Sequence, residues 1–305
     1  MAVAAAVGAA VGAADAEAAI KTITNLPHLG VGFGFRDRYH TDVFVHRSSI
    51  DFLEITADHF FDASRAKREQ LELLSRNFTL IPHGLSLSLG SADGIDDEYL
   101  RQLAEIVAAV NPPWWSEHIA FTHAGGIDIG HLTSLPRTKE SLAVLGMNIQ
   151  RAKTAIPTPL ILENITESIR YPGDQIDEAS FLGELLEEND CGLLLDVTNL
   201  YTNSVNHGFD PLPLLWRLPR ERIVQLHFAG GHWLDETLID SHSTPACDEV
   251  WSLLGEVLAY ADVRGIILER DEKLPSIKEI LGEVDRAREM YLQAKVNKNL
   301  APCEG

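Results

Sequence analysis

Residues 192–196 read Gly-Leu-Leu-Leu-Asp, a run of strand length in which apolar side chains lead up to a single carboxylate. The same form occurs before it in residues 159–164 and after it in residues 223–227, where the runs again end in acidic, amide or imidazole groups. Amphipathic segments separate these runs, and this alternation favours parallel strands joined by crossover helices. The pattern therefore predicts an α/β fold.

The alternation extends over most of the chain and gives eight strand-length runs. They lie at residues 29–35, 51–56, 79–83, 114–118, 159–164, 192–196, 223–227 and 265–269. Apolar residues at helical spacing lie between them, as in Leu142, Leu145 and Ile149. Eight strand-helix units over about 270 residues match the usual size of a (β/α)₈ TIM barrel. We predict one barrel domain at residues 27–294, a flexible Ala-rich extension at 1–26 and a disordered tail at 295–305.

The composition disfavours several functional classes. The 305-residue chain carries 45 acidic against 25 basic side chains, which gives a formal net charge of −20. Such a surface is unsuited to nucleic-acid phosphates or anionic lipid, so we expect neither a nucleic-acid nor a membrane partner. Three cysteines without paired spacing indicate neither a disulfide framework nor a zinc ribbon. The first 20 residues lack the basic segment of a signal peptide, and we expect a cytoplasmic protein.

The predicted strand ends carry groups that bind metals. In a TIM barrel the active site forms at the C-terminal ends of the strands and in the loops after them. Six consecutive strands place there His83, Glu117 and His118, Glu163 and Asn164, Asp196, His227 with Asp240 and His242, and Glu269 with Asp271. One such residue alone is more often a hydrogen-bonded structural group. Gathered at one barrel mouth, these groups need compensation for burial and like-charge repulsion, which a divalent metal supplies.

The types of side chain narrow the choice of metal. Imidazoles and carboxylates without cysteine disfavour structural zinc and suit iron, manganese or a catalytic zinc cluster. Their number exceeds what one ion can use, which indicates two ions with positions open for water, oxygen or substrate. Because a fold does not decide the reaction class, a divalent-metal sugar isomerase, a metal-assisted hydrolase and a noncatalytic metal-binding protein remain alternatives.

From about residue 30 to residue 271 the sequence closely resembles the multinuclear non-heme iron-dependent oxidative enzymes, a barrel family that includes the methanobactin-maturing and 3-thiaglutamate-pathway proteins. The motifs that carry the resemblance are GVGFGF at 30–35, DFLEITADHFF at 51–61, HGLSLSLGS at 83–91, SEHIAF at 116–121, LEN at 162–164, LLLDVTNLY at 193–201, NHGFDP at 206–211, HFAGG at 227–231, DSH at 240–242 and LERD at 268–271. So many ordered matches make a specific signal.

The resemblance implies a xylose-isomerase-like barrel that holds two or three irons. It implies that dioxygen is used to oxidise a side chain, often cysteine or aspartate, of a ribosomally made precursor peptide, which a partner protein presents. Carried onto this chain, the metal ligands are His83, Glu117, Asn164, Asp196, His227, Asp240, His242 and Glu269. The expected catalytic residues are Asp58, His118 and Asp271.

The chain departs from this family at the second predicted strand. Many relatives have His at the position of Thr56 and Glu at that of Asp58. Threonine is a poor iron ligand beside imidazole and carboxylate. We therefore expect any third ion to be held weakly, through Asp58, His59 or water.

Overall fold

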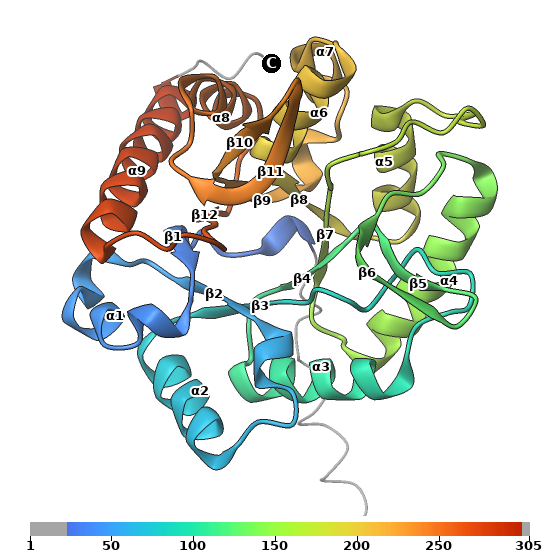
Figure 1. The fold of residues 1–305 in the computed structure, drawn as a ribbon. Coiled ribbons are helices and arrows are strands. Elements are labelled where there is room, and N and C mark those ends of the chain that lie inside the picture. The colour runs from blue at the N-terminus through green and yellow to red at the C-terminus, as the bar shows by residue number, and fades with distance from the viewer. Residues whose placement is uncertain (1–22, 301–305) are drawn as a thin grey trace, which may run out of the picture.

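The computed structural model describes residues 23–300, which form a closed barrel of eight parallel strands surrounded by helices (Figure 1). The barrel strands are β1 (Gly30–Gly34), β2 (Leu53–Thr56), β3 (Leu80–His83), β4 (Trp115–His118), β7 (Leu160–Glu163), β8 (Gly192–Asp196), β9 (Ile223–Phe228) and β12 (Gly265–Leu268). Hydrogen-bonded neighbours follow the order β1, β12, β9, β8, β7, β4, β3, β2, and β2 pairs with β1 to close the barrel. The predicted TIM barrel and its eight strands are confirmed.

Helices cover the outside of the barrel. The α-helices are α1 (Asp42–Val45), α2 (Arg65–Asn77), α3 (Asp97–Val110), α4 (Lys139–Ala155), α5 (Glu178–Glu188), α6 (Val197–His207), α7 (Pro211–Leu215), α8 (Asp248–Tyr260) and α9 (Ile277–Leu300). Short 3₁₀ helices lie in the connections, at η1 (Ile23–Asn25), η2 (Asp37–Tyr39), η3 (Arg47–Ser49), η4 (Ala57–Phe60) and η5 (Arg220–Arg222). The side chains of Ser64, Asp96 and Thr138 accept hydrogen bonds from first-turn N–H groups and so fix where α2, α3 and α4 begin.

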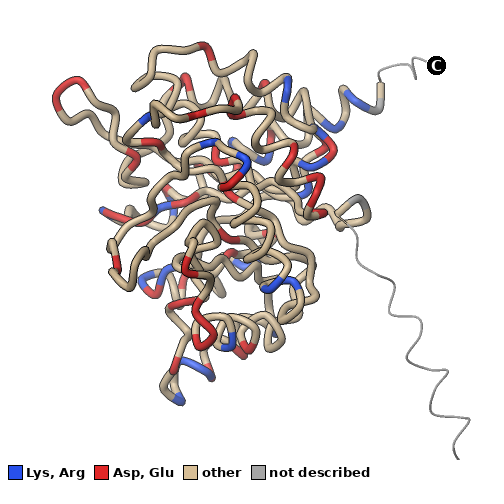
Figure 2. Tube along the Cα trace, turned by 90° about the vertical axis from the view of Figure 1, so that its right-hand side faces the viewer, with Lys and Arg blue, Asp and Glu red and all other residues tan. Residues whose placement is uncertain are grey.

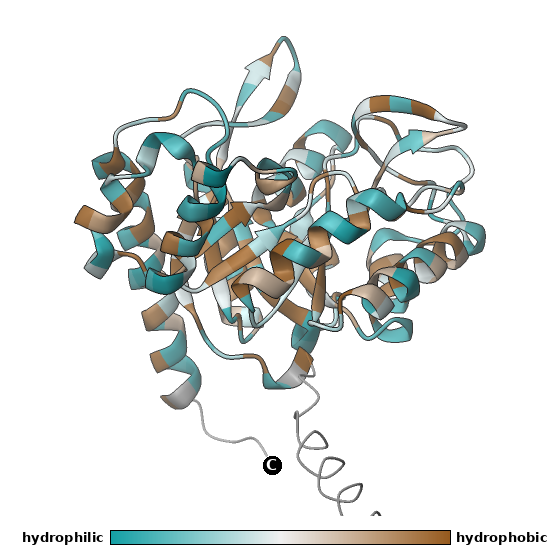
Figure 3. Cartoon of the chain, turned by 90° about the horizontal axis from the view of Figure 1, so that it is seen from below, coloured by the Kyte–Doolittle hydropathy of each residue, from teal (hydrophilic) through white to brown (hydrophobic). Residues whose placement is uncertain are grey.

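The barrel strands alternate between two environments. On β8, Leu193 and Leu195 pack outward among the residues that face the helices, whereas Leu194 belongs to the cluster inside the barrel. That inner cluster also contains Phe52, Ile81, Trp114, Ile161 and Ile267. Figure 3 shows hydrophobic segments, drawn in brown, in the barrel strands at the centre of the molecule. The barrel interior is therefore a packed core at this level.

A polar layer follows the apolar one. Side chains two positions apart on a strand face the same way. The residues two positions after the six inner apolar residues are Glu54, His83, Ser116, Glu163, Asp196 and Glu269. All six are at most 8% exposed. The strand period thus brings buried polar side chains together toward the C-terminal mouth.

Two β-hairpins add to the simple alternation of strands and helices. β5 (Phe121–Ala124) and β6 (Ile127–Thr133) follow β4, whereas β10 (Gly230–Leu234) and β11 (Thr237–Thr244) follow β9. Each pair forms its own antiparallel two-stranded sheet at the C-terminal side of the barrel (Figure 1). The sequence pattern did not indicate these strands because none of them is a continuous apolar run, and β6 and β10 are largely exposed without a buried apolar face.

Both predicted domain boundaries need correction. Ile23 and Leu26 are buried in the inner apolar cluster, so residues 23–26 are part of the packed body and not of a flexible extension. At the other end α9 continues to Leu300, so residues 295–300 are helical where a disordered tail was predicted. The Lys298 ammonium donates a hydrogen bond to the carbonyl of Ala261 and anchors the last turn. The predictions for residues 1–22 and 301–305 lie outside the described residues.

Charged side chains are spread along the chain. Figure 2 shows acidic residues in many parts of the trace, interspersed with fewer basic ones. Among residues 23–300, no helix is long and apolar enough to span a lipid bilayer.

Candidate metal centre

Seven strands and loops contribute to a compact set of imidazoles and carboxylates at the barrel mouth. His83 ends β3, His118 ends β4, Glu163 ends β7 and Asp196 ends β8. His227 lies on β9, His242 lies on β11, and Glu269 and Asp271 follow β12. All are buried except Asp271, whose side chain is 43% exposed.

These residues form three overlapping groups, each with ligand atoms within 4.8 Å of one another. The first is His83, His118 and Glu163; the second is Glu163, Asp196, His227 and Glu269; the third is His242, Glu269 and Asp271. Glu163 belongs to the first two groups and Glu269 to the last two. A carboxylate has two oxygens, so each of these glutamates can serve two adjacent positions.

The distances show how closely the donor atoms approach. In the first group, His83 Nε2 and His118 Nε2 lie 3.4 and 3.5 Å from Glu163 Oε2. His227 Nδ1 lies 3.4 Å from Glu163 Oε1 and 3.0 Å from Glu269 Oε2. His242 Nδ1 lies 3.2 Å from Glu269 Oε2. The glutamates therefore connect all four imidazoles.

Several of these atoms lack hydrogen-bond partners although they are buried. Among the described residues, the site atoms without such a partner are Glu163 Oε2, Asp196 Oδ2, His227 Nδ1, Asp240 Oδ1 and His242 Nε2. Asp240 Oδ1 and His242 Nε2 lie only 2.7 Å apart, but they do not meet hydrogen-bond geometry. Buried polar atoms are nearly always bonded. Because carboxylate oxygens and imidazole nitrogens are the donors that iron, manganese and zinc accept, these residues fit a metal centre.

Burial and neighbouring charges shift the pKa values of the group. Burial lowers the pKa of His118, but carboxylates, Glu163 first, raise it to about 9. For His227 and His242, burial likewise lowers the pKa, but neighbouring carboxylates raise it further, so both pKa values lie well above the ordinary range. Burial raises the pKa of Asp196 to about 7. The positive charge of protonated imidazoles thus offsets the negative charge of the carboxylates. Histidines bind metal in the neutral form, so a bound divalent cation would supply that positive charge in place of the protons.

Two imidazoles are oriented by partners behind them. Ser116 Oγ lies 2.8 Å from His83 Nδ1, which leaves His83 Nε2 facing Glu163. Glu117 Oε1 lies 3.3 Å from His118 Nδ1, which again leaves Nε2 facing Glu163. Metal-bound histidines commonly have such a partner on the second ring nitrogen.

Most of the predicted site residues come together. The predicted ligands that occur in the three groups are His83, Asp196, His227, His242 and Glu269. The predicted ligand Asp240 lies beside His242. His118 and Asp271, which were expected to be catalytic, also belong to the groups.

The side chains of two predicted ligands, Asn164 and Glu117, form hydrogen bonds with backbone groups. The Asn164 amide accepts a hydrogen bond from the Asp196 N–H at 2.8 Å and donates one to the Asp196 carbonyl at 3.1 Å, so it joins β7 to β8. Glu117 accepts hydrogen bonds from the N–H groups of His118 and Leu87, at 2.8 and 3.3 Å. Neither occurs in the three groups formed by the described residues.

The residues at which this chain differs from many relatives, Thr56 and Asp58, and the neighbouring His59 also lie outside the three groups of described residues. Asp58 accepts a hydrogen bond from the Tyr99 hydroxyl at 2.7 Å and one from the Leu85 N–H at 3.1 Å. These bonds tie the end of β2 to the loop after β3. Burial raises the pKa of Asp58. His59 is exposed, whereas Thr56 is buried beside His83 in the β2–β3 register.

Sequence reasoning missed the roles of Glu163 and Arg36. Glu163 was noted at a strand end, but Asn164 was preferred as the ligand. The strand period could have identified Glu163, because it faces the same way as Ile161, whereas Asn164 faces the opposite way. Arg36 is the second residue after β1; it pairs with Asp271 and lies 3.8 Å from Glu269 Oε1. No pattern in the sequence singled it out.

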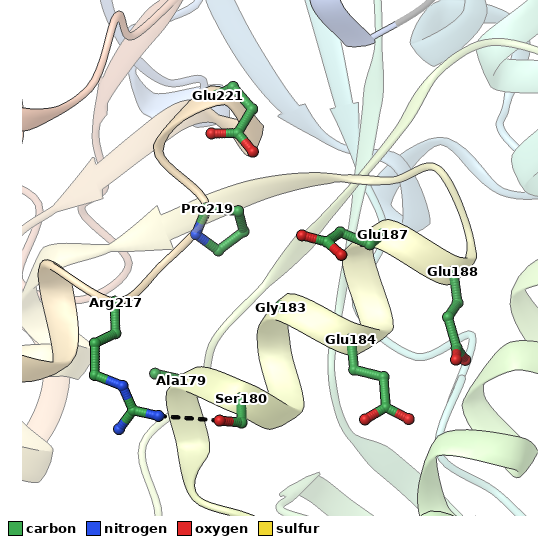
Figure 4. A pocket seen from close by; sticks show the side chains of 9 residues that line it. All are labelled: Ala179, Ser180, Gly183, Glu184, Glu187, Glu188, Arg217, Pro219 and Glu221. Carbon is green, nitrogen blue, oxygen red and sulfur yellow. Dashed lines mark hydrogen bonds between the residues drawn. The ribbon is translucent and has the colours of Figure 1, made fainter.

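A surface pocket lies elsewhere. Figure 4 shows it beside α5, lined by Glu184, Glu187 and Glu188 on that helix and by Arg217 and Glu221 from the segment before β9. None of its lining residues belongs to the three groups. The pocket is therefore separate from the candidate metal centre at the barrel mouth.

Comparison with known proteins assigns the family. The sequence profile of a family described as RiPP precursor modification enzyme MbnB/TglH/ChrH matches residues 30–292. The chain belongs to this family. Its relatives include proteins named UPF0276 protein from Caulobacter vibrioides, 34% identical over 87% of this chain and 95% of the relative, and from Vibrio vulnificus, 32% identical over 90% and 94%. A Streptomyces avermitilis relative is 38% identical over 91% of this chain, which spans only 58% of that relative's length.

Solved structures confirm the type of barrel in this MbnB/TglH/ChrH family member. D-psicose 3-epimerase from Clostridium cellulolyticum H10 matches with a TM-score of 0.54 and 13% identity, over 88% of this chain and 98% of its own. A xylose isomerase domain protein from Planctomyces limnophilus gives a TM-score of 0.53 and 14% identity, over 88% and 98%. At these identities the likeness concerns the fold, which is a xylose-isomerase-like TIM barrel.

Proposed function

We propose that this RiPP precursor modification enzyme is a non-heme oxidase with a multinuclear iron centre that uses dioxygen to oxidise a cysteine or aspartate side chain of its precursor peptide. The observation that carries the proposal is the overlap of the three groups through Glu163 and Glu269. Sites that share carboxylates hold ions next to one another, which an isolated single-ion site does not. Imidazole and carboxylate donors without cysteine suit iron.

Each group has a defined place in the proposal. His83, His118 and Glu163 would hold one ion, and Asp196, His227 and Glu269, with Glu163, would hold the next. His242 and Asp271, with Glu269, form the outer position, where a third ion would be held most weakly because Asp271 is partly exposed and paired with Arg36. Bound iron would supply the electron transfer that couples oxidation of the peptide side chain to reduction of dioxygen.

The protein's own residues would orient the peptide and shelter the centre. The barrel walls exclude water from the first two groups, whose residues are at most 8% exposed. The partly exposed Asp271 marks the side from which a substrate can approach. Ile127, Trp233 and Leu234 are 68%, 58% and 60% exposed on the two hairpins that follow β4 and β9. These apolar side chains suit contact with the peptide or with a partner protein that presents it.

The test combines metal analysis with turnover. Protein expressed with added iron should contain two or three iron ions per chain. It should consume dioxygen in the presence of the precursor peptide encoded beside its gene, and mass spectrometry should find an oxidative mass change at a cysteine or aspartate. Stoichiometric zinc alone, or peptide modification that proceeds equally well without oxygen, would contradict the proposal.

A further inference from the structure

A chain of buried hydrogen bonds runs through the barrel interior and ends at His227. The Trp114 indole N–H donates to Gln225 Oε1 at 2.8 Å, and Gln225 Nε2 donates to Glu54 Oε2 at 2.6 Å. Glu54 Oε2 lies 3.0 Å from His227 Nε2. These side chains come from β2, from β9 and from the residue before β4, and none is more than 3% exposed. A buried carboxylate therefore lies directly behind one proposed ligand.

The chemistry of these groups fixes which atom of His227 carries a hydrogen. An indole N–H can only donate, so Trp114 holds the oxygen of the Gln225 amide toward itself and turns the nitrogen toward Glu54. An ionised carboxylate can only accept. The contact between Glu54 and His227 is then a hydrogen bond in which Nε2–H of His227 is the donor. Gln225 Nε2 and His227 Nε2 lie 3.1 Å apart because both donate to the same oxygen.

The opposite ring nitrogen faces the candidate metal centre. Metal binding requires a neutral imidazole, and with its one hydrogen on Nε2 the lone pair of His227 lies on Nδ1. Nδ1 lies 3.0 Å from Glu269 Oε2 and 3.4 Å from Glu163 Oε1, and it has no hydrogen-bond partner among the described residues. His83 and His118 have the reverse arrangement, since their Nδ1 atoms face Ser116 and Glu117.

We propose that Glu54 is a positioning residue that fixes His227 to bind metal through Nδ1. This role rests on the proposed metal centre. Glu54 contacts the ring on the side away from Glu163 and Glu269 and belongs to none of the three groups of described residues, so it acts through His227 and not as a ligand. Carboxylates behind metal-bound histidines set ring orientation and raise ligand basicity.

The coordinating nitrogen can be identified directly with Zn(II), a diamagnetic probe. Protein labelled with ¹⁵N-histidine and loaded with Zn(II) should show the His227 ring bound at Nδ1, with its hydrogen on Nε2 and protected from exchange. Glu54→Ala should lose that protected hydrogen signal. Coordination of Zn(II) through Nε2 of His227 in the unaltered protein would overturn the proposal.

Affinity for Fe(II), titrated without oxygen, provides the second measurement. Glu54→Ala should weaken Fe(II) binding by roughly 10- to 100-fold, the usual effect of removing such a partner. The Fe(II) affinity of Glu54→Gln should lie between those of the unaltered protein and Glu54→Ala, because the amide oxygen still accepts a hydrogen bond but carries no charge. Ile55→Val changes the next residue of β2, which packs outward, and should leave the affinity unchanged.

The outcomes separate this role from the metal centre itself. Fe(II) binding by the unaltered protein with equal affinity in Glu54→Ala would refute the role of Glu54 and leave the centre standing. An unaltered protein that binds neither ion would refute both. Should Glu54→Ala fold poorly, the Glu54→Gln titration and the Zn(II) spectrum of the unaltered protein still decide the question.

Discussion

At the scale of single residues, the neighbouring side chains Glu163 and Asn164 make different contacts. The family resemblance favoured Asn164 as a ligand, but its amide is occupied by the backbone of Asp196. Glu163 instead offers oxygens to two of the three groups. A one-residue shift on a strand turns a side chain to the opposite face, which is why Glu163 and not Asn164 faces the same way as Ile161.

We expect Glu163→Gln to remove most of the bound iron, because the substitution takes a charged donor from two adjacent positions at once. Glu117→Gln is the matched control. Glu117 was also predicted as a ligand, but its oxygens face the backbone and His118 Nδ1. Iron content by elemental analysis should fall steeply in the first variant and much less in the second, because Glu117→Gln keeps a side-chain oxygen that can still accept a hydrogen bond from His118 Nδ1–H. The reverse pattern would show that the ligand set implied by the family resemblance was right at Glu117.

The pKa of His118 makes a prediction about stability. Burial lowers this pKa, but Glu163 and its neighbours raise it to about 9, above the value of about 6.5 for an unperturbed imidazole. A raised pKa stabilises the folded state below pH 6.5, and this contribution is lost as the pH rises through 9. The loss should be about 3 kcal/mol.

Urea unfolding of the metal-free protein at pH 6.5 and pH 9.5 measures this loss. His118→Gln should show a smaller fall in unfolding free energy over the same range, because the titrating imidazole is absent. An equal fall in both proteins would assign the pH dependence to other groups.

At the scale of elements, the hairpin formed by β10 and β11 completes the outer part of the site. It carries Asp240 and His242, and His242 has a left-handed backbone with φ of 46°. Such a conformation is uncommon for a residue with a side chain and costs energy, so the surrounding contacts must hold it. Asn206 on α6 donates to the Leu238 carbonyl at 2.8 Å and accepts from the Leu238 N–H at 2.9 Å. These two hydrogen bonds hold the hairpin against α6.

Asn206→Ala should loosen this hairpin, since it removes both hydrogen bonds at once. Each such bond contributes about 1 kcal/mol. Amide hydrogen exchange in β11 should become faster, and the ion nearest His242 should be lost first on dialysis. Exchange in α2, on the other side of the barrel, serves as the internal control and should not change. Unaltered exchange in β11 would show that other contacts hold the hairpin.

The eight barrel strands could be predicted because each is short, buried on both sides and, in most cases, largely apolar. The hairpins could not, because strands such as β6 are mostly exposed and have no buried face to produce an alternation. For the site, placing polar residues at strand ends was enough to bring His83, Asp196 and Glu269 together. The role of Glu54 was not predicted, since it depends on contacts with residues more than 170 positions away.

At the scale of the whole molecule, the barrel combines an apolar layer with a layer of buried charges. The apolar layer stabilises the fold, whereas the carboxylates repel one another and cost free energy to bury. Metal binding to the folded state should therefore raise stability, by about 2.7 kcal/mol at a free metal concentration 100 times the Kd. Thermal unfolding with added Fe(II) under nitrogen, compared with chelator-treated protein, should show a higher melting temperature. Equal melting temperatures would contradict a buried metal centre.

Anomalous scattering at the iron absorption edge, from crystals of protein expressed with added iron, would locate the proposed iron ions directly. We expect two or three iron peaks in a row, with Glu163 between the first and second and Glu269 next to the second. The outer peak, near His242, should have the lowest occupancy. A single isolated peak, or density that scatters as zinc and not as iron, would contradict the proposed multinuclear iron centre.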